Sequence, residues 1–173
     1  SDITIFSFHP VKIITTGEGG MAVTNSQKLS DKMSLLRSHG ITRDPELMTH
    51  KPDGDWYYQQ IELGYNYRMT DIQAALGISQ IQRLDQYVEK RHNIAARYND
   101  AFKKINLSTP YQSKSNYSSY HLYVIMFQDK ISKHHKDIFT RLRKCGIGVN
   151  LHYIPVYMHP YYRSMGFEIG DFP

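Results

Sequence analysis

The chain has 173 residues, a formal net charge of +5, and 40% hydrophobic and 21% charged residues, which is an ordinary composition for a globular protein with a core. It has neither an apolar run of bilayer-spanning length nor a secretory signal, so we expect no membrane association. Its lysines and arginines are dispersed and form no basic arm, which argues against a nucleic-acid-binding protein.

Cys145 is the only cysteine, so no disulfide framework exists, in agreement with a reducing cytoplasm. His134 and His135 lie in the polar start of a predicted helix, and with one cysteine in the chain we expect no metal site. Fourteen tyrosines are a high count, and tyrosine suits interfaces and polar pockets because it combines an apolar ring with a hydroxyl.

An apolar segment near the start of the chain, residues 3–8, predicts a buried strand because it is rich in β-branched and aromatic side chains. His9-Pro10 ends the strand, since proline cannot donate to a sheet. Lys12 follows, where low-dielectric surroundings would lower the pKa of its amine. A neutral amine there could attack a carbonyl and form a Schiff base. The alternative is an ordinary surface lysine after a strand.

The next elements are a short strand at residues 21–24 and an amphipathic helix at residues 27–38, which Gly40 ends in a left-handed conformation. Residues 41–63 predict a long irregular connection, and such connections are usually functional or mobile. Its aromatic stretch, Trp56-Tyr57-Tyr58, could cover a substrate or pack on the core.

Thr70-Asp71-Ile72-Gln73 has the form of a capping box and predicts a helix start. Apolar residues then recur at helical spacing to about residue 103, so we expect one long helix, or two with a bend. The polar stretch at 85–97 suits a helix that links two domains. We place the boundary so that residues 1–90 form one domain and residues 91–173 another.

The second domain begins with a polar loop at residues 104–119. We expect a strand at 120–127, a helix at 131–145 that stops at Gly146, and a strand at 147–153. This strand–helix–strand order predicts a small α+β domain.

Four motifs, in order over nearly the whole chain, resemble those of the DegT/StrS-type sugar aminotransferases. They are Ser7-Phe8-His9-Pro10-Val11-Lys12 with Thr15-Thr16-Gly17-Glu18-Gly19-Gly20, then Arg37-Ser38-His39-Gly40, Gly64-Tyr65-Asn66-Tyr67-Arg68-Met69-Thr70-Asp71, and His152-Tyr153-Ile154-Pro155. Members of that family are α/β enzymes of fold type I that use pyridoxal 5'-phosphate (PLP). The resemblance implies that residues 1–90 are the C-terminal part of the PLP-binding large domain. A long linking helix and most of the small α+β domain, residues 91–173, would follow.

The resemblance places the cofactor on Lys12, which would carry PLP as a Schiff base and also move a proton in catalysis. It implies that Ser7 binds the cofactor phosphate, provided that the chain turns at Pro10 and so brings Ser7 and Lys12 to the same opening. His9 could contact the cofactor or could be a structural histidine that caps the strand. Glu18 is expected to be a local hydrogen-bonding partner.

The family's second site segment places Asn66 on the phosphate of the partner subunit in a homodimer, and Arg68 on phosphate or substrate. The alternative for Asn66 is a turn residue before the helix cap. His152 and Tyr153 would approach the sugar, or would form a strand-end pair packed under Pro155.

The resemblance implies transfer of an amino group from an amino acid, taken as glutamate, to the C4 keto group of a UDP-linked 4-keto-6-deoxy sugar. That reaction belongs to amino-sugar synthesis, including pseudaminic acid, and to cell-surface polysaccharide synthesis. The family's pyridine-binding aspartate and glycine-rich phosphate turn lie before the lysine motif, so we expect this chain, from Ser1 to Pro173, to be an inactive fragment of an enzyme. The alternative is a noncatalytic aminotransferase fold that binds or dimerises. A dehydratase branch has histidine in place of the lysine, so Lys12 argues against it.

Overall fold

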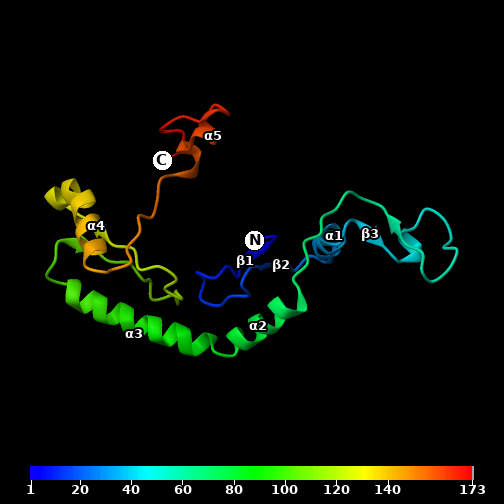
Figure 1. The fold of residues 1–173 in the computed structure, drawn as a ribbon, viewed down its shortest axis with the longest axis horizontal. Coiled ribbons are helices and arrows are strands. Elements are labelled where there is room, and N and C mark those ends of the chain that lie inside the picture. The colour runs from blue at the N-terminus through cyan, green and yellow to red at the C-terminus, as the bar shows by residue number, and fades with distance from the viewer. Residues whose placement is uncertain (173) are drawn as a thin grey trace. The chain divides into compact units, whose positions relative to one another are not determined.

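The computed structural model describes residues 1–172, apart from the side chains of residues 129–131. The chain divides into two compact units, Ser1–Asn93 and Ile94–Pro173. The division falls three residues after the boundary placed from the sequence at residues 90 and 91. Figure 1 labels the five α-helices of the described residues and the strands β1 to β3.

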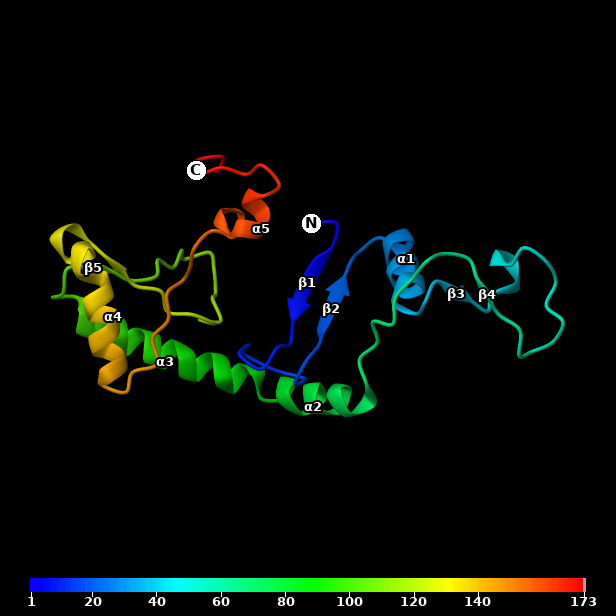
Figure 2. The ribbon, with the colours of Figure 1, turned by 45° about the horizontal axis from the view of Figure 1, so that its top comes forward.

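The first unit opens with an antiparallel hairpin of β1 (Thr4–Ser7) and β2 (Gly20–Val23), seen side by side in Figure 2. The register pairs Thr4 with Val23 and Ser7 with Gly20. Both predicted strands are confirmed, but β1 is exposed at all four positions, so the expectation of a buried strand is wrong for this chain. The physical reason is that a two-stranded sheet covers neither of its own faces.

Helix α1 (Gln27–Arg37) begins at Ser26, whose side chain accepts a hydrogen bond from the Leu29 amide. Gly40 follows it at φ 69°, as predicted, and its amide donates to Leu35 O. The long connection to residue 63 is not wholly irregular. It contains the antiparallel pair β3 (Ile41–Thr42) and β4 (Gln59–Gln60), and a 3-10 turn at Pro45–Leu47.

The predicted capping box starts α2 (Asp71–Ile81). The Thr70 side chain accepts from the Gln73 amide, and the Gln73 side chain accepts from the Thr70 amide. The helical pattern is divided between α2 and α3 (Leu84–Phe102), with a break at residues 82–83. The prediction of two helices with a bend is therefore confirmed.

The second unit contains the antiparallel pair β5 (Leu107–Ser108) and β6 (Met126–Phe127), a 3-10 turn at Asp129–His134, α4 (His135–Lys144), a 3-10 turn at Val156–Met158 and α5 (Pro160–Arg163). Helix α4 ends before Gly146, at φ 77°, as predicted.

Two strand predictions in the second unit are wrong. Only Met126–Phe127 of the predicted strand 120–127 is a strand, and residues 147–153 form none. Tyr120 has φ 45°, which interrupts an extended chain. Residues 147–153 have the composition of a strand but meet no neighbouring strand among the described residues, so no ladder forms.

Few side chains are buried. Among the described residues, the buried hydrophobic side chains are Val88 and Ala95, and the buried polar ones are Thr16 and Thr42. Large apolar side chains are exposed on every kind of element, as at Ile5 (71%) on β1 and Ile72 (85%) on α2. Since apolar patches on a folded protein usually mark contact surfaces, the two units present much surface suited to further packing.

Candidate active site

The loop between β1 and β2, residues 8–19, turns sharply after the first strand. The Ser7 Oγ accepts from the His9 amide at 3.4 Å, and the Lys12 amide donates to His9 O at 2.9 Å. The predicted turn at Pro10 is therefore present. Through His9, this turn brings the backbones of Ser7 and Lys12 to the same end of the hairpin, where Lys12 is half-buried.

Phe8, the first residue of this loop, bonds to the part of the loop that returns to β2. Its carbonyl accepts from the Thr16 amide at 3.0 Å and from the Thr15 hydroxyl at 2.9 Å. Its amide donates to Gly19 O at 2.9 Å. Because both backbone groups of Phe8 bond to the returning chain, the loop is closed directly above the sheet.

The His9 ring is engaged within the loop. Its Nδ1 accepts from the Val11 amide at 3.4 Å, and its Nε2 lies 3.7 Å from the Glu18 carboxylate. These contacts favour the structural alternative for His9 and give Glu18 the local role expected of it. Both side chains are largely exposed, so the pair contributes little to stability.

Asn66 lies on a second segment, residues 64–67, that pairs with the end of α1. Ser38 and Asn66 form an isolated antiparallel bridge, while Tyr65 N donates to Leu36 O at 2.7 Å. The ring centroids of Tyr65 and Tyr67 are 4.8 Å apart, in a stacked arrangement. This extended pairing exposes the Asn66 side chain and gives it a fixed backbone, unlike a free turn.

Arg68 is exposed immediately after this segment. Within residues 1–172, no hydrogen bond or ion pair joins Arg68 or Asn66 to Ser7, His9 or Lys12. The first unit thus brings together three of the predicted site residues and holds the other two on a separate segment.

His152 and Tyr153 belong to the second unit and are exposed. Their predicted strand is absent, and the Tyr153 ring stacks on His159 at a centroid distance of 5.9 Å.

The connection at residues 43–58 contains a polar network that sequence reasoning missed. The Tyr57 hydroxyl lies 2.7 Å from His50 Nε2, and Gln59 Nε2 bonds to both residues. Arg43 lies over the Tyr58 ring at 5.7 Å. Trp56 is 74% exposed, so it does not pack on a core in this chain. No residue spacing in the sequence signals this network, because its members pair across an irregular loop.

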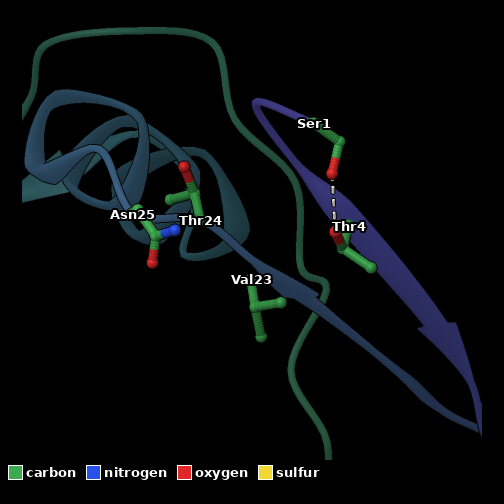
Figure 3. A pocket seen from close by; sticks show the side chains of 5 residues that line it. All are labelled: Ser1, Thr4, Val23, Thr24 and Asn25. Carbon is green, nitrogen blue, oxygen red and sulfur yellow. Dashed lines mark hydrogen bonds between the residues drawn. The ribbon is translucent and has the colours of Figure 1, made fainter.

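A shallow hollow lies at the opposite end of the hairpin, beside the first residue of β1 (Figure 3). Its lining residues are Ser1, Thr4, Val23, Thr24 and Asn25. The Ser1 and Thr4 hydroxyls bond to each other at 2.9 Å. None of these five lining side chains is ionisable.

Over the described part of the chain, no group of His, Cys, Asp and Glu side chains is arranged to hold a metal ion. In the same residues, no helix combines the length and apolar character needed to cross a membrane.

The sequence profile of the DegT/DnrJ/EryC1/StrS aminotransferase family matches residues 1–173. The chain belongs to this family. It shares 41% identity over 174 residues with the UDP-4-amino-4,6-dideoxy-N-acetyl-beta-L-altrosamine transaminase of Campylobacter jejuni, an alignment that covers 98% of this chain and 43% of that protein.

Solved structures of the family have the same fold. Helicobacter pylori PseC, an aminotransferase involved in pseudoaminic acid biosynthesis, superposes with a TM-score of 0.85 at 34% identity over 95% of this chain and 42% of its own. The putative sugar aminotransferase Spr1654 of Streptococcus pneumoniae, in its PLP form, gives 0.85 at 29% identity over 100% and 43%. The chain therefore spans less than half the length of these relatives. Its assignment to the fold of the PLP aminotransferases is confirmed.

Proposed function

We propose that the whole protein is a PLP-dependent sugar-nucleotide aminotransferase and that Lys12 holds the cofactor. The observation that carries the proposal is the hairpin end, where hydrogen bonds through His9 link Ser7 to the backbone of Lys12, a half-buried residue. Family membership over the full chain and the PLP form of Spr1654 support the same cofactor.

The donor set at this turn fits PLP. Lys12 supplies the primary amine that an aldehyde requires, and Ser7 supplies a hydroxyl of the kind that binds phosphate. Because Ser7 Oγ accepts its hydrogen bond from the His9 amide, its own hydrogen remains available to donate to a phosphate oxygen.

The cofactor, when bound, supplies an electron sink that stabilises a carbanion. The protein would contribute a proton carrier, because the Lys12 Nζ, when free, could accept and then release the proton that leaves the α carbon of the amino acid. The loop hydrogen bonds on Phe8 and His9 keep the Lys12 backbone in place while its side chain moves.

We propose the C4 keto group of a UDP-linked 4-keto-6-deoxy sugar as the acceptor, since the Campylobacter relative is named for a UDP-4-amino-4,6-dideoxy sugar. Glutamate is the proposed amino donor, as the family resemblance implies. Glutamate becomes 2-oxoglutarate as its amino group moves to the sugar. The net charge of +5 favours an anionic nucleotide-sugar. Arg68, His152 and Tyr153 are the proposed substrate contacts.

We further propose a homodimer in which Asn66 binds the phosphate in the partner's site. Its exposed amide on a paired, extended segment supports this role, because a fixed backbone can present the side chain outward. We place the activity in the cytoplasm, where the exposed thiol of Cys145 stays reduced.

Reduction of the PLP-loaded full-length protein with borohydride, followed by peptide mass spectrometry, tests the cofactor site. The expected result is a pyridoxyl group on Lys12, with none on Lys28 or Lys32 of α1. A full-length protein that stays colourless with added PLP and yields no adduct would instead support a noncatalytic binding or dimerising fold.

A further inference from the structure

Thr16 is one of the two buried polar residues among those described, at 4% exposed, yet it lies only four residues from Lys12. Its amide donates to Phe8 O, and its Oγ1 donates to Glu18 O at 2.7 Å. A β-branched side chain has few rotamers, so this hydroxyl bond fixes the direction of the Cγ2 methyl as well. Thr16 therefore has one available orientation in the loop.

The Thr16 methyl points at helix α2. A Cβ atom placed on Gly77 of that helix would lie 2.9 Å from Thr16 Cγ2, closer than carbon atoms in proteins approach. Gly77 has ordinary helical geometry, so the backbone itself does not require glycine there. The absence of a side chain at residue 77 is what lets the loop sit directly on the helix.

A second contact lies at the start of the same helix. A Cβ on Gly19 would lie 2.8 Å from Met69 Cε and would overlap Thr16 Oγ1. Met69 precedes Thr70, which caps α2. Both ends of the stretch from Thr16 to Gly19 thus rest against α2 or the residue that leads into it.

We propose that Thr16 and Gly77 are positioning residues, which seat the Lys12 loop on α2 and so fix the lysine relative to the cofactor. The assignment rests on the proposed role of Lys12. The same helix begins directly after the segment that carries Asn66 and Arg68, so one support serves both segments of the first unit.

Four variants of the full-length protein test this role: Gly77→Ala, Thr16→Ser, the double variant, and Gly148→Ala. Thr16→Ser removes the Cγ2 methyl and keeps the hydroxyl. Gly148 has open space around its Cα and no left-handed φ, so Gly148→Ala is the matched control. The first measurement is amide hydrogen exchange of peptides covering residues 9–20 without cofactor. The second is the yield of pyridoxyl-Lys12 over a PLP titration.

Gly77→Ala should speed exchange in residues 9–20 and raise the PLP concentration needed for half-maximal labelling about tenfold, since overpacking a close contact displaces the loop. The double variant should recover to within about twofold of wild type, because the missing methyl makes room for the new one. Gly148→Ala should change neither quantity. The visible absorbance of the bound cofactor, followed against pH, should shift in Gly77→Ala and return in the double variant, which a general loss of stability would not produce.

Unchanged exchange and labelling in Gly77→Ala would overturn the proposal, as would a loss that Thr16→Ser fails to restore. If Gly77→Ala does not fold, the folded double variant together with faster exchange in Thr16→Ser supports the contact, and a double variant that also fails to fold contradicts it. Absence of pyridoxyl-Lys12 in wild type would refute the proposed function alone, because the exchange arm tests the loop without cofactor.

Discussion

The Lys12 loop follows strand β1, and the His152 segment, residues 147–155, comes after helix α4. Both carry predicted site residues, yet they are built differently. The loop is closed by the bonds that Phe8 makes to Thr16 and Gly19, and it rests on α2 through Thr16. Among described residues, the hydrogen bonds of the segment stay within itself, reach back to α4, as from Ile147 N to Leu142 O, or come from the turn that follows, as from Met158 N to Pro155 O. Among the described residues, the loop is therefore supported by an element distant in sequence, whereas the segment is bonded only to its neighbours along the chain.

Lys12→Ala gives the sharpest test of the loop's importance. We expect covalent PLP labelling to disappear and the full-length transaminase rate to fall about 10²–10⁴-fold, because both the cofactor attachment and the proton carrier are lost. Single-turnover kinetics with the amino donor measure the effect. Lys28→Ala on α1 is the matched control and should leave the rate unchanged.

Gly40→Ala tests whether the other tight turn of the first unit is equally dependent on its local geometry. Gly40 has φ 69°, and a Cβ there would overlap Glu62 O and lie 2.6 Å from Glu62 C. We expect a loss of about 1–3 kcal/mol in the free energy of unfolding. Urea denaturation measures it against Gly148→Ala, which should stay within about 0.5 kcal/mol of wild type. Equal urea midpoints for Gly40→Ala and Gly148→Ala would contradict the requirement for glycine at residue 40.

Tyr153→Phe probes the segment. It keeps the ring that stacks on His159 and removes only the hydroxyl. If that hydroxyl binds the sugar-nucleotide, KM should rise about threefold to tenfold with kcat nearly unchanged, as for the loss of one hydrogen bond. Steady-state kinetics on the full-length enzyme decide the matter, and a KM equal to that of wild type removes Tyr153 from the site.

The smallest effect concerns pH. Partial burial raises the pKa of the Tyr123 hydroxyl, which also donates to Asn99 Oδ1 at 2.5 Å. The unfolded chain then loses this proton first as pH rises, so the stability from Tyr123 is complete below about pH 10 and declines above it. Tyr123→Phe should flatten that part of the stability–pH curve. A wild-type curve already flat above pH 10 would contradict the shift.

The features that the sequence predicted correctly are those that depend on neighbouring residues, and the features it missed depend on distant ones. The capping box at Thr70, the Gly40 and Gly146 stops and the turn at Pro10 were all predictable, because each depends on side chains within a few residues. The strands at 120–127 and 147–153 were not, since a strand needs a partner, and neither composition nor alternation says where that partner lies. The sequence did not predict the Thr16–Gly77 contact for a related reason. The contact depends on the absence of a side chain at Gly77, and such an absence produces no recognisable pattern.

The assigned roles of Ser7, Asn66 and Arg68 came from family resemblance and stay predictions. The structure adds the backbone contacts that hold two of these residues. A turn around His9 holds Ser7, and pairing with the end of α1 holds Asn66. No periodicity in the sequence marks residues 64–67 as extended chain paired with Leu36 and Ser38.

The bare hairpin has one more consequence. Within the described part of the chain, strands β1 and β2 pair only with each other, so each has an unpaired outer edge. The exposed side chains of Ile5, Phe6 and Met21 make both faces of the pair apolar. Unpaired strand edges readily form hydrogen bonds with strands of other chains. This hairpin, expressed by itself, would therefore tend to aggregate and to bind chaperones. Lys12, the proposed cofactor lysine, lies just after one of these two strands, so its loop is attached to a part of the fold whose edges and faces need cover from other segments.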